Sequence, residues 1–310
     1  MDAWASSAAA THVLGRGSVD GVPELIAFVV YRSSQSFPTL LSSPRSLRTS
    51  PNSLSVFSAQ LLSAKSTSSL KMQTKVFVSA LLAGMATAQT LNIPTRSGSI
   101  VSLSAPSTIS GSKDYANKEF DRGRACDTDA DTGSDSAVFI LENGATLSNV
   151  IIGANQLEGV HCKGACTLKN VWFRDVCEDA ISALGTGDVL IQGGGAQNAV
   201  DKVVQHNGRG TVTIDGFTVV TAGKLYRGCG DCTNNGGPRN VIVKNVKAKS
   251  VKELVGINSN YGDVATISNT CGSSVSKVCQ EYKGVSKGSG ESSKVSTTAN
   301  CKGQTSLSAC

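Results

Sequence analysis

Charged side chains precede apolar residues at regular intervals through the middle of the chain, and their signs are sorted. Glu158 and the pair Glu178 and Asp179 come first, and Lys202 and Lys224 follow. Several carboxylates together are the oxygen donors that calcium prefers. A lysine that loses its proton can act as a general base. The sequence therefore predicts a metal site held by acids, with amines directly beside it.

A simpler interpretation exists for each of these residues taken alone. Charges on the outside of a folded chain are normal, and ion pairs between neighbouring segments would satisfy them. The ordered set favours the metal site, because a random mixture of signs does not usually place acids in two successive segments and lysines in the next two.

The elements that must position these residues are short β-branched segments separated by turns rich in glycine and asparagine. Their first residues are 21, 21, 23, 29 and 23 positions apart, and they begin at Leu147, Leu168, Val189, Val212, Val241 and Val264. A repeat slightly longer than twenty residues is typical of one coil of a parallel β-solenoid. The longest step contains residues 229–237, which we expect to project as a loop.

The charged positions recur in phase with these strands, 10 to 12 residues further along each coil. Neighbouring parallel strands lie about 4.8 Å apart, so equivalent positions should form a ladder on one face. Adjacent strand residues point to opposite faces, so Glu178 and Asp179 can share one ion only if a bend or bulge separates them.

The chain resembles the small pectate lyases of polysaccharide lyase family three. The resemblance covers roughly residues 93–279, and it is carried by residues 137–153, 158–162, 176–180, 201–205 and 223–227. It implies an all-β fold, a right-handed single-stranded parallel β-helix. It also implies a secreted enzyme that cleaves polygalacturonate, the backbone of plant cell-wall pectin, by β-elimination.

The resemblance further implies residue roles. The acids Glu158, Glu178 and Asp179 match the positions that hold Ca²⁺, and Lys202, Lys224 and Arg227 match the family's catalytic and substrate-binding basic residues. Glu158 stands where bacterial members often have the shorter aspartate.

These roles agree with general chemistry. Calcium bound to a galacturonate carboxylate would stabilise the charge that forms when the C5 proton leaves. Lys202, one coil above Asp179, is the better candidate base, and nearby cations should lower its pKa. Lys224 and Arg227 would bind a second substrate carboxylate. An alkaline optimum follows, because a higher pH frees the base.

Two other functions remain as alternatives. Paired acids are also the signature of glycoside hydrolases, but nearby lysines oppose the raised pKa that a general acid needs. A non-catalytic wall-binding solenoid would keep the coils and tolerate the loss of Lys202.

Three segments differ in composition. Residues 1–71 are rich in serine and carry four of the seven prolines, and we expect disorder there or an over-extended gene model. Residues 72–88 have the basic, apolar and small-residue regions of a secretory signal peptide. Residues 89–310 form the predicted lyase domain. No apolar run reaches the roughly 20 residues that a membrane span needs.

All ten cysteines lie beyond Ala88, as expected of an exported protein with up to five disulfides. Cys162 with Cys166, and Cys229 with Cys232, are candidates for short local loops. The same spacings permit zinc, with His161 nearby, but the signal peptide favours disulfides. We expect Cys301 and Cys310 to fasten the polar segment 286–310.

Charge and the remaining motifs narrow the partners. The chain carries +6 overall, but residues 89–310 hold 22 basic and 20 acidic side chains, so we expect no binding of nucleic acid. We expect a monomer whose partner is polygalacturonate. A local basic strip that faces a polyanion stays possible. Residues 127–131 alternate acids like a calcium loop, but the pattern fits poorly and predicts an exposed acidic loop. We interpret His161 and His206 as structural.

Overall fold

The computed structural model describes residues 91–128 and 130–310. The predicted signal peptide and the preceding serine-rich segment lie outside the described residues. Within the described ranges the chain is almost entirely β-strand, with two short 3₁₀ helices, η1 (Ser134–Ser136) and η2 (Ser259–Tyr261), and no α-helix. No helix there has the length and apolarity to cross a membrane.

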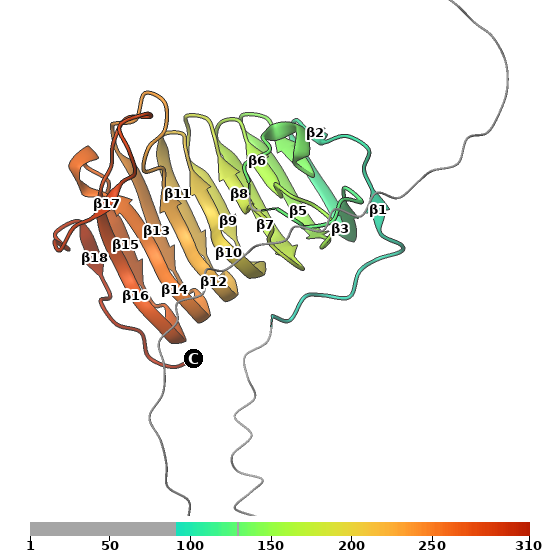
Figure 1. Cartoon of the computed structure of the whole chain (residues 1–310). Helices are drawn as coiled ribbons and strands as arrows, with labels where there is room; N and C mark the ends of the chain where they lie inside the picture. The colour runs from blue at the N-terminus through green and yellow to red at the C-terminus, as the bar shows by residue number, and fades with distance from the viewer. Residues whose placement is uncertain (1–90, 129) are drawn as a thin grey trace, which may run out of the picture. The chain divides into compact units, whose positions relative to one another are not determined.

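The strands stack coil upon coil in one continuous sheet that winds as a right-handed parallel β-helix (Figure 1). The fold prediction is therefore confirmed. The strands are β1 (Val101–Ser102), β2 (Ser107–Ile109), β3 (Ser112–Asp121), β4 (Phe139–Leu141), β5 (Ala145–Ile152), β6 (Val160–Cys162), β7 (Cys166–Phe173), β8 (Asp179–Ala183), β9 (Val189–Gln192), β10 (Gly195–His206), β11 (Gly210–Asp215), β12 (Thr218–Gly228), β13 (Arg239–Lys244), β14 (Lys247–Asn258), β15 (Ala265–Ser268), β16 (Cys271–Lys283), β17 (Ser293–Lys294) and β18 (Cys301–Gly303).

Each coil turns a corner between two faces through a residue of positive φ. Asn149 and Asn170 have φ of 50° and 51°, a conformation that asparagine tolerates better than most residues. The Asn170 side-chain amide donates to Asn149 Oδ1 at 3.1 Å, so successive corners are joined along the solenoid. Asn149 in β5 and Asn170 in β7 therefore set both the bend and the stacking of these coils.

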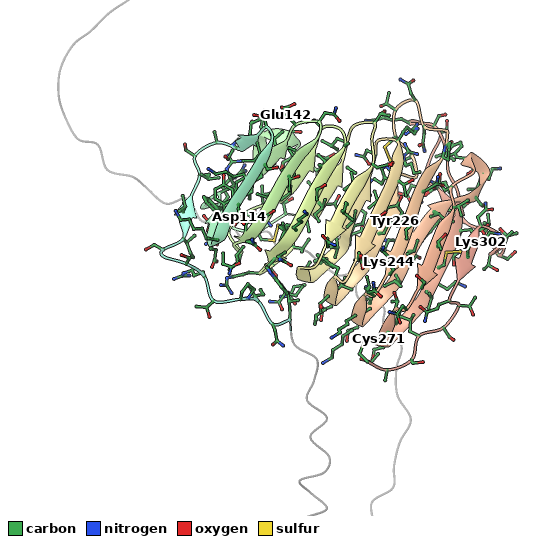
Figure 2. The ribbon with its side chains drawn as sticks, turned by 180° about the vertical axis from the view of Figure 1, so that it is seen from behind. Asp114, Glu142, Tyr226, Lys244, Cys271 and Lys302 are labelled. Atoms are coloured by element: carbon green, nitrogen blue, oxygen red, sulfur yellow. A yellow bond between two sulfur atoms is a disulfide. The ribbon has the colours of Figure 1, made fainter. Side chains whose placement is uncertain are left out.

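Alternate residues of each coil point inward and stack on the equivalent residue of the next coil. One column of the core runs through residues no more than 1% exposed, namely Leu147, Leu168, Ile191, Ile214, Val243 and Ile267. Full burial of such a side chain stabilises the fold by about 1.5–3 kcal/mol. Figure 2 shows the outward side chains, with Asp114 and Lys302 near the two ends of the stack.

The register corrects two of the aligned strand starts. Leu168 pairs with Ile191, so the coil starting at Val189 is shifted by two residues relative to our alignment. Val241 pairs with Ala265 instead of Val264. A two-residue shift keeps the same residues facing inward, so residue types alone could not detect it. At the last strand Ala265 and Ile267 are buried and Val264 is not fully buried.

The loop and the cysteines follow the predictions. The segment between β12 and β13 leaves the coil as a loop, closed by the disulfide Cys229–Cys232. All ten cysteines are paired, which excludes the zinc interpretation. The other four disulfides are Cys126–Cys177, Cys162–Cys166, Cys271–Cys310 and Cys279–Cys301. The last two fasten the C-terminal segment to β16.

Candidate active site

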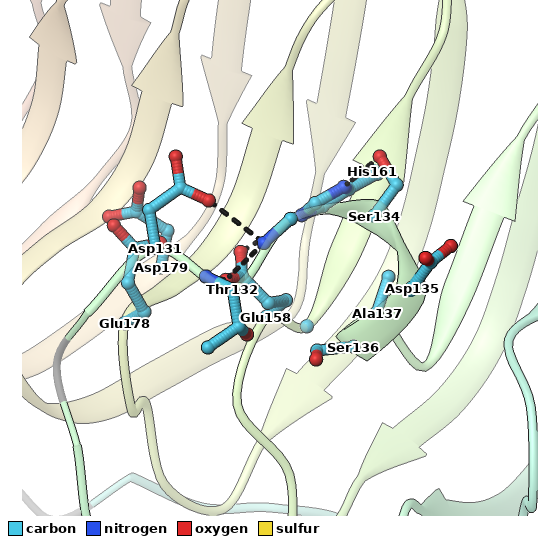
Figure 3. A network of polar contacts seen from close by, with 12 residues as sticks. Asp131, Thr132, Ser134, Asp135, Ser136, Ala137, Glu158, His161, Glu178 and Asp179 are labelled. Atoms are coloured by element: carbon cyan, nitrogen blue, oxygen red, sulfur yellow. Dashed lines mark hydrogen bonds and ion pairs between the residues drawn. The ribbon is translucent and has the colours of Figure 1, made fainter. Parts of the chain in front are cut away.

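The three predicted acids stand at the entries to two neighbouring strands. Glu158 lies in a bend before β6, and Glu178 lies in a bend directly before β8, whose first residue is Asp179. All three line one pocket, together with Asp131. Figure 3 shows the acids gathered beside the loop that carries Thr132. The bend at Glu178 is the feature that lets two adjacent residues face the same space.

Glu158 is the most firmly held of the acids. Its Oε1 accepts hydrogen bonds from the Thr132 hydroxyl at 2.9 Å and from the Gly133 amide at 3.1 Å, and also from the Thr132 amide. Its Oε2 lies 3.3 Å from Nε2 of His161. Burial acts to raise the pKa of Glu158, but the hydrogen bonds from His161 and Thr132 outweigh it and lower the pKa. The carboxylate is thus kept ionised.

Glu178 and Asp179 are held less completely. Burial raises the pKa of Glu178, and the charge of Asp179 raises it further. Burial also raises the pKa of Asp179, although Lys202 opposes this. Asp179 is 2% exposed, and its Oδ1 has no hydrogen-bond partner. A buried carboxylate with an unsatisfied oxygen, next to the half-buried carboxylate of Glu178, forms a place that favours a cation.

The donors suit a hard divalent cation. They are all carboxylate oxygens, which calcium accepts in irregular geometry. Within residues 91–128 and 130–310, no group of three or more His, Cys, Asp or Glu side chains is placed so that it could hold a metal ion. Glu178 and Asp179 lie side by side in the pocket, and Glu158, bonded by Thr132 and His161, lies beside them.

Lys202 lies directly across from Asp179 in the register of β8 and β10. Its Nζ is 2.7 Å from Asp201 Oδ2, 3.4 Å from Asp179 Oδ1 and 3.8 Å from Glu178 Oε1. Burial acts to lower the pKa of Lys202, but Asp179 and Asp201 raise it above the ordinary value. Our expectation of a lowered pKa is therefore wrong for the protein without bound metal, because three carboxylates surround this amine.

Lys224 follows one coil later and pairs with Lys202 in the register of β10 and β12. Asp201 lies between the two amines, accepting from Lys202 through Oδ2 and from Lys224 through Oδ1 at 2.5 Å. Burial acts to raise the pKa of Asp201, but hydrogen bonds from both lysines lower it. Asp201 was not among the predicted site residues, although its place beside Lys202 was a signal.

Arg227 is buried at the wall of the same face. Its guanidinium donates to Asn258 Oδ1 at 3.0 Å and to Ser292 Oγ at 2.8 Å, and it stacks on the Tyr282 ring with 4.0 Å between Cζ and the ring centroid. Burial lowers the pKa of Arg227 from its usual value. These contacts fix the plane of the guanidinium, and Ser292 comes from the C-terminal segment that sequence reasoning had treated only as a tail.

The acids and the basic residues line adjoining pockets. Gln205 lines both the acid pocket and a second pocket that contains Lys202, Lys224 and Arg227. The structure thus brings all six predicted residues to one side of the solenoid. The described acids of the 127–131 loop, Asp127 and Asp131, are exposed as predicted, and Asp131 also lines the acid pocket. The disulfide Cys126–Cys177 ties this loop to the residue before Glu178.

Both histidines, predicted to be structural, bond neighbouring side chains. His161 bonds Glu158 on one side, and its Nδ1 is 3.0 Å from the Ser134 hydroxyl. His206 is fully buried, with Nδ1 2.8 Å from the Tyr226 hydroxyl. Among the described residues, neither histidine forms a hydrogen bond with Lys202 or Lys224.

Comparison with known proteins agrees with this arrangement. The sequence profile of a family described as pectate lyase matches residues 90–289. A protein of Neosartorya fischeri named probable pectate lyase E is 52% identical over 222 residues, which are 70% of this chain and 86% of the relative. Pectate lyase E of Emericella nidulans is 51% identical over the same shares of both chains.

Solved structures give the same result. The catalytic domain of pectate lyase PelI from Erwinia chrysanthemi is 36% identical, with a TM-score of 0.57 over 68% of this chain and 97% of that domain. PelI in complex with tetragalacturonic acid is also 36% identical, with a TM-score of 0.54 over 65% of this chain and 66% of the other.

Proposed function

The chain belongs to the pectate lyase family, and from this premise we propose that it is a secreted, calcium-dependent enzyme that cleaves (1→4)-linked polygalacturonate by β-elimination. The observation that carries the proposal is the placement of Lys202 within 4 Å of both Glu178 and Asp179. A base beside a cation site is what removal of a proton next to a carboxylate requires.

Calcium suits the acid pocket because the candidate ligand atoms there are carboxylate oxygens. Glu178 and Asp179 would bind the ion directly, and Glu158, kept ionised by Thr132 and His161, would add the third carboxylate. When bound, calcium would withdraw charge from a galacturonate carboxylate and so make the C5 proton more acidic.

Lys202 would take the C5 proton. In the protein alone this amine is protonated, because the carboxylates of Asp179 and Asp201 raise its pKa. Neutralising the charge of Glu178 and Asp179 would remove part of that effect and favour the free amine. The C5–H electron pair then forms the C4–C5 double bond, and the C4 oxygen leaves with the adjoining sugar.

Lys224 and Arg227 would hold the substrate. Asp201 orients the Lys224 amine, and Tyr282 supports the Arg227 guanidinium from below. Both cations can engage a uronate carboxylate, and the planar guanidinium can do so through two hydrogen bonds. These two contacts would hold the sugar ring in a fixed position beside Lys202 while the proton is removed.

The remaining parts of the proposal rest on the chain's context. The five disulfides favour an oxidising, extracellular location. We expect the enzyme to act as a monomer.

The product identifies the reaction class. Purified protein incubated with polygalacturonate and calcium should release 4,5-unsaturated uronides, detected by their ultraviolet absorbance. Excess chelator should stop the reaction, and added calcium should restore it. Reducing sugar without the absorbance would identify a hydrolase, and binding without either product would identify a wall-binding protein.

A further inference from the structure

A second cleft continues from the active site toward the C-terminal coils. It shares Asp201, Lys224 and Tyr282 with the pocket of the proposed site. Beyond these it is lined by three further lysines, Lys252, Lys277 and Lys294, and we call this region the lysine cleft. The shared walls make it a continuation of the site along the axis of the solenoid.

The strand register sets the spacing of the lysine cleft. Lys202 pairs with Lys224, Lys224 with Glu253, and Glu253 with Lys277. Each step is one strand spacing of about 4.8 Å, so the backbones of Lys202 and Lys277 lie roughly 14 Å apart. This distance suits a linear chain with a charged group on each of its units.

The charge of the lysine cleft is only partly neutralised by its own carboxylates. In the described part of the chain, neither Lys252 nor Lys277 forms an ion pair. Glu253 is buried, and its Oε2 accepts from the Tyr282 hydroxyl at 2.7 Å, with Lys294 Nζ 4.0 Å away. The carboxylate is thus part of the wall and pairs with Lys294, and the amines of Lys252 and Lys277 remain for a ligand.

The C-terminal segment completes the lysine cleft. β17 pairs antiparallel with the end of β16 and places Lys294 opposite Tyr282. The neighbouring Ser292 bonds Arg227. One short segment therefore contributes to the active site and to the cleft beyond it.

We propose that the lysine cleft is an extended binding site for the uronate chain, which takes the free carboxylates of sugars beyond those bound at Lys202, Lys224 and Arg227. The proposal rests on the function proposed above. The polyanionic substrate matches the charge, and the shared walls let one chain occupy both regions. The cleft should favour longer, unesterified substrates, because each methyl ester removes a charge that the lysines would bind.

The test compares two double variants with equal loss of charge. Lys277→Gln/Lys294→Gln alters the lysine cleft, and Lys118→Gln/Lys169→Gln removes two exposed lysines from β3 and β7, on other coils. Each is made in full-length protein with Lys202→Ala, so that the ligand is not cleaved. Calorimetry with calcium present measures the Kd for trigalacturonate and hexagalacturonate.

We expect the cleft variant to bind hexagalacturonate about tenfold more weakly, since two exposed charge contacts are lost. Its Kd for trigalacturonate should change less than about twofold, and the control should match the parent for both ligands. Equal weakening for both lengths, or no weakening, would overturn the proposal. Failure of the wild-type enzyme to form unsaturated product would instead count against the proposed function.

Discussion

Lys202 stands directly across from Asp179 on the neighbouring strand, with its Nζ 3.4 Å from an Asp179 oxygen that has no hydrogen-bond partner. The same oxygen is a candidate ligand for calcium. The proposed base and the proposed metal ligand are therefore held one strand spacing apart by the backbone itself. This geometry explains why the solenoid, more than any single loop, positions the chemistry.

Removal of one buried acid should weaken calcium binding. Asp179→Asn takes away a charged donor from the acid pocket, and we expect calcium affinity to fall about tenfold or more. Calorimetry with calcium alone measures this without substrate. Glu142→Gln, an exposed carboxylate after β4, is the control and should bind calcium as the wild type does. Equal affinity in Asp179→Asn and wild type would remove this residue from the metal site.

The disulfide beside Glu178 should stabilise both the fold and the pocket. Cys126 and Cys177 are 51 residues apart, so replacing both by serine should lower the free energy of unfolding by about 4 kcal/mol. Replacing Cys229 and Cys232, which close a loop of only a few residues, should cost about 2 kcal/mol. Urea denaturation compares the two variants. A larger loss from the short loop would show that loop length does not govern these stabilities.

His206 should make the fold sensitive to mild acid. Burial lowers the pKa of His206 from 6.5 to about 3, so only the unfolded chain takes up a proton between these values. Stability is then full above pH 6.5 and falls as the pH drops toward 3. Between pH 6.5 and 5, protonation of this histidine in the unfolded chain should lower the free energy of unfolding by about 1.5 kcal/mol.

The variant His206→Gln isolates this contribution. It keeps a polar partner for the Tyr226 hydroxyl and removes the titrating ring. Its urea unfolding free energy should change less between pH 6.5 and 5 than that of the wild type. Identical pH dependence in both proteins would assign the acid sensitivity to other groups.

The fold was predictable because the sequence pattern that specifies it recurs in every coil. Strands recurring with asparagine or glycine corners specify a coil, and the inward column from Leu147 onward confirms it. The pairing of Lys202 with Lys224 also agreed with the repeat. The predicted alignment at Val189 was wrong by two residues because a two-residue shift leaves the inward pattern unchanged.

Features of the site that depend on loops were not visible in the sequence. Thr132 holds Glu158, and Ser292 holds Arg227, but both come from segments outside the repeat. No periodicity fixes where such segments fold back. The role of Asp201 was missed for another reason, because its two lysine partners stand on different coils and share it only in three dimensions.

The most direct test of the account is chemical rescue of the proposed base. Lys202→Ala should bind calcium and polygalacturonate but form unsaturated uronide about 10²- to 10⁴-fold more slowly than the wild type. Added small primary amines should restore part of the rate, increasingly as pH rises and frees the amine. A Lys202→Ala enzyme that keeps wild-type activity, or that binds calcium and substrate normally yet never responds to amines, would contradict the assignment of Lys202 as the base.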